Sequence, residues 1–114
     1  MISVLLFAAV ATPSFAPKTT ALIDSYRNCL LNEGLELEPS GAEFDDVFKA
    51  SETACISVWA DTHQAVWSEL EKQPPVSGRE PADVAYEFLE NMKLSWKNDV
   101  RLAVLRQRAG RKAK

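Results

Sequence analysis

The sequence predicts an all-α fold: a three-helix up-down-up bundle, with one short and two long helices, behind an N-terminal signal peptide. Apolar residues recur at three- and four-residue spacing through most of the chain, which is the period of an amphipathic helix. No stretch shows the strict alternation of a half-buried strand, and no segment repeats. The 114 residues are enough for one domain and too few for two, and 46% hydrophobic with 25% charged residues is typical of a folded protein.

The longest helical pattern runs from Ser40 to Gln73, 34 residues without a proline. Ser40 and Glu43 match the capping box that opens many helices, and the two prolines after Gln73 end the pattern. Its first apolar face consists of Phe44, Val47, Phe48, Ala54, Cys55, Val58, Ala65 and Val66. From Ile56 onward a second apolar stripe widens this face, so we expect this half to contact two neighbours, one of which can be a second subunit.

A shorter helix is expected before this segment. Thr19 or Thr20 can cap its start, and Gly34 suits its C-terminal end. Its core stripe consists of Leu22, Tyr26, Cys29 and Leu30. Because this helix is about half as long as the other two, their far ends would lack a third partner within one chain.

A long C-terminal helix is expected to begin between Ser77 and Pro81 and to end near Ala109–Gly110. Its core stripe consists of Val84, Ala85, Phe88, Leu89, Met92, Trp96, Val100 and Ala103. Two courses are compatible with the pattern. The helix either stays straight or breaks near Ser95–Asp99 and folds back over the core.

The first sixteen residues have the pattern of a cleaved signal peptide. The apolar run from Ile2 to Ala11 is broken only by Ser3 and is followed by small residues and a helix breaker. This run is shorter than the roughly 20 residues of a membrane span. Cleavage is expected near Ala11 or Ala16, and the first position avoids a proline just past the cut. A buried N-terminal helix and an uncleaved anchor are the alternatives.

Export would divide the chain into a leader (residues 1–16), a helical domain (17–110) and a basic disordered tail (111–114), and would place the protein in the periplasm or outside the cell. Cys29 and Cys55 are the only cysteines, and an exported protein meets oxidising surroundings. Both lie on core-facing stripes, so we expect a disulfide that stabilises the fold by roughly 3 kcal/mol. Two buried free thiols are the alternative.

The charges are strongly polarised along the chain. Residues 19–92 hold 15 acidic and 4 basic side chains, whereas residues 93–114 hold 8 basic and 1 acidic. The basic end includes a ridge, which we call the basic ridge, made of Lys93, Lys97, Arg101 and Arg108. Two interpretations stand: these cations pair with the acidic body of the same or a neighbouring molecule, or they contact an anionic partner such as a membrane surface. Nucleic acid is disfavoured, because the acidic remainder would repel phosphate.

Large apolar residues on the two long helices indicate a partner surface, because the short first helix cannot cover their full length. Trp59, Trp67 and Trp96 would each bury roughly 150–250 Å² if covered. The last helix also carries leucines off its core stripe that need a covering partner: Leu94, Leu102 and Leu105. We therefore expect a protein partner or, most simply, a homodimer.

No set of residues indicates catalysis. His63 is the only histidine and has no recognisable nucleophile or orienting carboxylate, so we interpret it as structural or pH-responsive. Two thiols and one distant histidine do not form a metal site, and no phosphate-binding glycine loop is present, so no cofactor is expected. The expected function is that of a small exported helical binding, adaptor or chaperone-like protein without catalytic activity. The alternative is a peripheral envelope protein that docks on an anionic membrane surface through its basic C-terminal helix.

Overall fold

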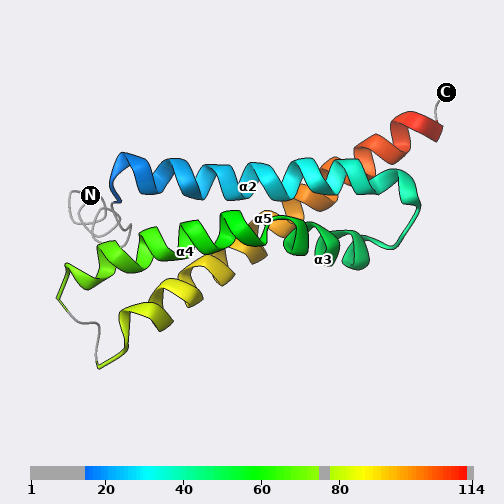
Figure 1. The fold of residues 1–114 in the computed structure, drawn as a ribbon. Coiled ribbons are helices and arrows are strands. Elements are labelled where there is room, and N and C mark those ends of the chain that lie inside the picture. The colour runs from blue at the N-terminus through cyan, green and yellow to red at the C-terminus, as the bar shows by residue number, and fades with distance from the viewer. Residues whose placement is uncertain (1–14, 75–77, 113–114) are drawn as a thin grey trace, which may run out of the picture.

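A computed structural model describes residues 15–74 and 78–112, and its regular elements in these ranges are helices (Figure 1). In chain order they are α2 (Pro17–Leu37), the short 3₁₀ helix η1 (Glu38–Ser40), α3 (Phe44–Ala54), α4 (Ile56–Glu71) and α5 (Pro81–Lys112). The all-α prediction is confirmed. The signal-peptide prediction lies almost entirely outside the described residues.

The described residues contain four α-helices, because the segment predicted as one long helix is divided at Cys55 into α3 and α4. The two follow each other alongside α2, and α5 passes behind them to reach the far end of α2 (Figure 1). Sequence reasoning recognises breaks by proline and glycine, and neither occurs between Ala42 and Gln73. The break falls instead at the residue that is covalently tied to α2.

The predicted start of this segment is also different. Ser40 closes η1, and its hydroxyl accepts a hydrogen bond from the Ala42 N–H at 3.3 Å. Gly41 follows in the left-handed conformation with φ of 76°, which glycine adopts without steric cost. The predicted capping box is therefore absent, and α3 begins at Phe44 after a turn.

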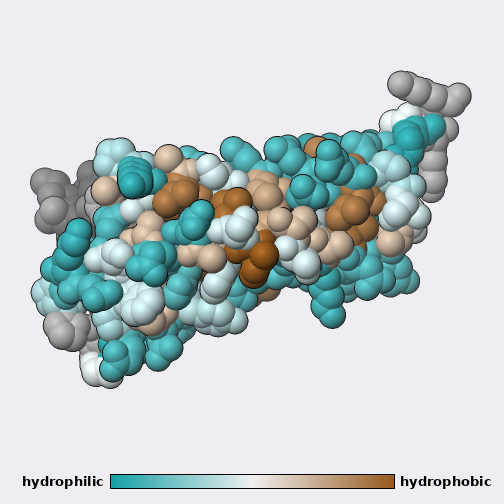
Figure 2. Space-filling model, in the orientation of Figure 1, coloured by the Kyte–Doolittle hydropathy of each residue, from teal (hydrophilic) through white to brown (hydrophobic). Residues whose placement is uncertain are grey.

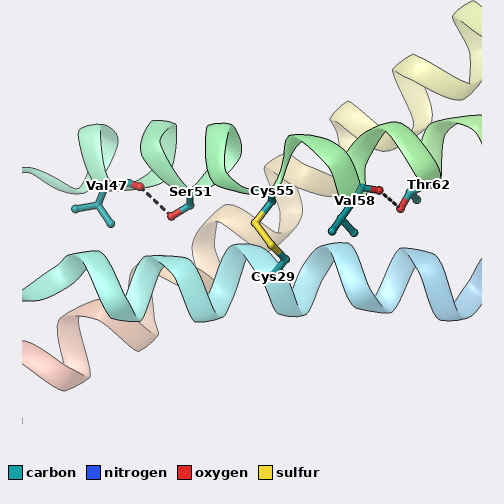
Figure 3. Close-up of a disulfide and its surroundings, with 6 residues drawn as sticks. All are labelled: Cys29, Val47, Ser51, Cys55, Val58 and Thr62. Carbon is teal, nitrogen blue, oxygen red and sulfur yellow. Dashed lines mark hydrogen bonds between the residues drawn. A yellow bond between two sulfur atoms is a disulfide. The ribbon is translucent and has the colours of Figure 1, made fainter.

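The predicted pairing of Cys29 with Cys55 is present in the structure, with sulfur atoms 2.06 Å apart and Cα atoms 6.0 Å apart (Figure 3). Cys55 is fully buried, and so are the hydroxyl side chains of Ser51 and Thr62 on either side of it. Ser51 donates to the Val47 carbonyl at 2.9 Å and Thr62 to the Val58 carbonyl at 2.7 Å. Because both hydroxyls are hydrogen-bonded, the surroundings of the disulfide carry no unpaired polar group on these residues.

Gly34 is a packing residue of α2 rather than the predicted end of that helix. The helix continues through Leu37 for a total of 21 residues. A Cβ atom at Gly34 would lie 2.8 Å from Cγ1 of Val100, so the missing side chain is what lets α5 approach α2 closely. Because α2 is longer than predicted, it also contacts the second half of α5, for which the sequence predicted no third helix within the same chain.

The core lies where α2 and α5 meet, with contributions from α3 and α4. It consists of Ile23, Tyr26, Leu30, Phe48, Cys55, Val66, Ala85, Leu89, Trp96, Val100 and Val104. Helix α5 stays continuous and does not fold back at Ser95–Asp99. It also extends past the predicted end at Ala109–Gly110, so Arg111 is helical and not part of a tail.

Hydrophobic residues gather in a band along the seam between α2 and the α3–α4 pair, with hydrophilic residues on both sides of it (Figure 2). Among the described residues, no helix combines the length and the apolar character that crossing a membrane requires.

Gly34→Ala is expected to lower the free energy of unfolding by about 1 kcal/mol. Overpacking against the stiff, buried Val100 costs ~1–3 kcal/mol, and the better helix propensity of alanine offsets up to ~1 kcal/mol of that. Urea unfolding measures the difference. The matched control is Gly110→Ala in α5, where a Cβ would meet no atom within 4 Å and stability should stay equal or rise. Equal gains for both variants would contradict the close contact at Gly34.

Candidate functional site

A groove lies between the α3–α4 pair and α5, and it includes a cavity of about 220 Å³. We call this the aromatic cavity. It is lined by Tyr26, Glu52, Ile56, Trp59, Tyr86, Glu90 and Lys93. These residues come from α2, α3, α4 and α5, so the cavity exists only when all four helices are packed.

The apolar rim of the aromatic cavity is unusually exposed. Ile56 is 60% exposed and Tyr86 is 52% exposed, although both are large hydrophobic side chains. Trp59 is half-buried beneath them, with its ring 6.0 Å from that of Tyr86 in an edge-to-face arrangement. Apolar surface left open beside a concavity is a common mark of a binding site.

The polar side of the aromatic cavity is an ion cluster centred on Lys93. Its ammonium lies 2.6 Å from Glu52 of α3 and 2.9 Å from Glu90 of α5. Burial by itself lowers the pKa of Lys93, but the hydrogen bonds to Glu52 and Glu90 outweigh it and raise the pKa. Lys93 therefore stays protonated, and it joins α3 to α5 across the groove.

A second hollow of about 380 Å³ continues the groove on the other side of this ion cluster. It shares Glu52, Glu90 and Lys93 with the aromatic cavity, and its lining includes Leu94, which is 64% exposed. Both hollows thus have an exposed apolar residue in their lining and share the paired charges between them.

An aromatic stack on α4 supports the cavity from behind. His63 stacks on Trp59 with ring centres 5.1 Å apart and planes at 9°, and its ring is 6.0 Å from that of Trp67. The His63 Nε2 atom is 3.1 Å from the Ala82 carbonyl oxygen, a contact that ties α4 to the start of α5. His63 therefore has a structural role in the folded chain.

The three tryptophans predicted as partner-binding residues do not form one surface. Trp96 is buried and packs edge-to-face on Tyr26, with ring centres 5.8 Å apart. Trp59 and Trp67 are half-buried and packed against the core. Only Trp59 lines the aromatic cavity.

The basic ridge makes contacts within the molecule at each of its four predicted positions. Besides Lys93, Lys97 lies 3.4 Å from an Asp45 oxygen and 5.5 Å from the ring centre of Phe48. The guanidinium of Arg101 lies over the Phe44 ring at 5.0 Å. Lys93 and Lys97 thus pair with carboxylates of the same molecule, as in the first interpretation of the ridge, whereas Arg101 contacts an aromatic ring.

Arg108 belongs to a fourth contact, built around the fully buried Glu38 of η1. Arg108 donates to Glu38 at 3.1 Å and to the Ala42 carbonyl at 2.6 Å, Gln107 donates to Glu38 at 2.7 Å, and Arg111 forms a two-pronged ion pair with the same carboxylate. Arg111, then Gln107 and Arg108, lower the pKa of Glu38 to about 2 against the effect of burial.

Sequence reasoning missed five lining residues of the aromatic cavity as site residues: Tyr26, Glu52, Ile56, Tyr86 and Glu90. One signal was available, since Tyr86 is an aromatic residue off the core stripe of its helix. In the described ranges, no group of three or more histidine, cysteine, aspartate or glutamate side chains is placed to hold a metal ion. The chemistry that the groove supports is binding through aromatic faces and carboxylates.

Glu38→Gln should remove a pH-dependent part of the stability. Because the folded-state pKa is about 2 and the ordinary value is 4.5, the charged Glu38 stabilises the fold fully above pH 4.5, and this contribution is lost as the pH falls toward 2. The difference in urea-unfolding free energy between wild type and Glu38→Gln should therefore shrink across that window. Glu36→Gln, which changes an exposed carboxylate on α2, is the control. A difference that stays constant with pH would refute the buried ion pair.

Comparison of the chain with protein-family models, with curated proteins and with solved structures finds no match.

Proposed function

We propose that this chain is a small exported helical protein that works by binding, without catalytic activity, and that the groove between the α3–α4 pair and α5 is its binding surface. One observation carries the proposal: Ile56 and Tyr86 remain more than half exposed, and both line a cavity that also contains the rings of Tyr26 and Trp59. A groove that is already formed in the folded chain favours this function, because a preformed site loses little conformational freedom when a ligand binds.

The disulfide supports the exported part of the proposal. Disulfides persist in the periplasm and outside cells and are rare in a reducing cytosol. A bridge between α2 and the junction of α3 and α4 also fixes the groove walls, so oxidising surroundings and a formed binding surface go together.

Packing near the leader favours cleavage after Ala11 over cleavage after Ala16. Phe15 packs against Phe88 with ring centres 5.3 Å apart. The Ala16 N–H donates to Glu69 at 2.9 Å, and its carbonyl accepts from the Thr20 N–H at 3.0 Å. Removal of residues 1–16 would delete these contacts, whereas removal of residues 1–11 retains them.

Membrane docking through the basic ridge is less well supported than binding at the groove. Lys93 and Arg108 are held by carboxylates, and Lys97 and Arg101 lie over aromatic rings, so docking on anionic lipid would compete with contacts already made.

A specific observation also favours self-association. Leu102 and Leu105 of α5 are 50% and 49% exposed, and a homodimer is the simplest way to cover them.

Processing and thiol state test the export proposal. The full chain, produced in a bacterium with a C-terminal tag, should yield a product that begins at Thr12 and whose cysteines react with an alkylating agent only after reduction. Intact mass measurement with and without reductant shows both properties. Ala11→Tyr should block cleavage, and Ala16→Tyr should leave it unchanged. An uncleaved product with two free thiols would overturn export.

Binding of the neutral dye Nile red tests the groove. The double variant Ile56→Ser/Tyr86→Ser should reduce dye fluorescence several-fold, because it removes the apolar rim. The matched control Leu102→Ser/Leu105→Ser should keep the dye signal and should lower self-association in sedimentation velocity if these leucines form a dimer face. Loss of dye binding in the leucine variant alone would place the binding surface on the outer face of α5 and refute the groove.

A further inference from the structure

The aromatic cavity has the composition of a site for a small organic cation, an inference that rests on the proposed binding function of the groove. Three aromatic rings from three helices line it: Tyr26 of α2, Trp59 of α4 and Tyr86 of α5. Aromatic faces attract cations through the ring quadrupole, most strongly when water is partly excluded. Burial raises the pKa of Tyr26 to about 12, so its ring stays neutral and adds no opposing charge.

The charge of the lining also favours a cation. Glu52 and Glu90 bring two negative charges and Lys93 brings one positive charge, which leaves one net negative charge. The exposures decide which of these groups a ligand meets. The carboxylate side chains are 31% and 30% exposed, whereas that of Lys93 is 14% exposed. A ligand in the cavity therefore meets carboxylates more than ammonium.

The size of the cavity and the hydration of the candidate ligands limit the class of ligand that fits. A cavity of about 220 Å³ is smaller than the ~300–1,000 Å³ pockets that hold drug-sized ligands. A purely apolar ligand would desolvate the two carboxylates without pairing them, which is unfavourable. A metal ion or bare ammonium is strongly hydrated and gains little from aromatic walls. A methylated ammonium group is compact, charged and weakly hydrated, and it matches both parts of the lining.

We propose that the aromatic cavity binds a small methylated ammonium group, either on a free compound or on a phospholipid headgroup. The ammonium lies against the rings of Trp59 and Tyr86 and faces the exposed oxygens of Glu52 and Glu90. Ile56 closes the rim over the methyl groups.

Titration with choline, followed by tryptophan fluorescence and by calorimetry, tests the proposal on the purified, oxidised protein. Choline should bind saturably, and its uncharged isostere 3,3-dimethylbutan-1-ol should bind about tenfold more weakly, because only charge distinguishes the two. Equal binding of the isostere, tighter binding of acetate, or the absence of saturable choline binding would overturn the proposal.

Variants locate the site. Tyr86→Ala and Glu90→Gln should each weaken choline binding by about fivefold to tenfold. Tyr86→Phe, which keeps the aromatic face, should retain it, and so should Leu102→Ala, which lies outside the cavity lining. Tyr86 is largely exposed, so its loss should leave the circular dichroism spectrum unchanged. Equal loss of binding in Leu102→Ala and Tyr86→Ala would refute the assignment to this cavity.

Two further measurements distinguish whether the methylated ammonium group belongs to a free compound or to a phospholipid headgroup. Sedimentation with phosphatidylcholine vesicles that free choline reverses would identify the lipid headgroup, and binding of choline without such sedimentation would identify a free compound. Phosphatidylglycerol vesicles serve as the control. The Nile red measurement is independent of this result: a groove that binds the dye through Tyr86 but ignores choline keeps the proposed function and loses only the ligand class.

Discussion

The bond between Cys29 and Cys55 joins α2 to the point at which α3 ends and α4 begins, and the walls of the groove are positioned from that point. Glu52 lies three residues before Cys55, Ile56 directly follows it, and Trp59 lies four residues after it. Three lining residues of the aromatic cavity are therefore within about one helical turn of the crosslink. A change in the position of Cys55 relative to α2 would move the polar and the aromatic wall together, so the covalent bond defines the site as well as the fold.

Helix α5 completes the groove, and its position depends on contacts at both of its ends. Near its start, the His63 contact with Ala82 ties it to α4. Toward its end, Gly34 admits Val100 at close range, and the buried Glu38 pairs with Arg108. Exposed ion pairs contribute little to stability, but a buried carboxylate without its partners would be strongly unfavourable. Part of the charge separation along the sequence is thus offset inside one molecule, where four basic residues of the last helix pair with acidic residues of the earlier elements.

Patterns in the sequence predict those features of the fold that depend on residues close together in the chain. Helical periodicity identifies most of the core, and the compartment argument identifies the cysteine pair. Two errors share a cause: a residue was interpreted from its chain neighbours when its role comes from another helix. Gly34 has the same sequence signature at a helix end as at a close helix crossing, and Cys55 gives no signal of a break. The cavity was missed for the same reason, because Tyr86 meets Trp59 only through the packing register of α5 on α4.

The widened apolar face of α4 shows why a binding surface remains at this place. The second stripe of this helix needs a second neighbour, and α5 supplies it for most of the length: Trp59, Trp67 and Leu70 are half-buried and packed on the core. Ile56, the first residue of the stripe, is left 60% exposed, because the Lys93 ion cluster holds α5 to α3 there through charged side chains. On α4, the large apolar surface that stays exposed is thus found at Ile56, beside a cavity with a net negative lining. A surplus distributed over the whole helix would indicate only loose packing, whereas one confined to the rim of a mixed aromatic and acidic cavity favours a ligand.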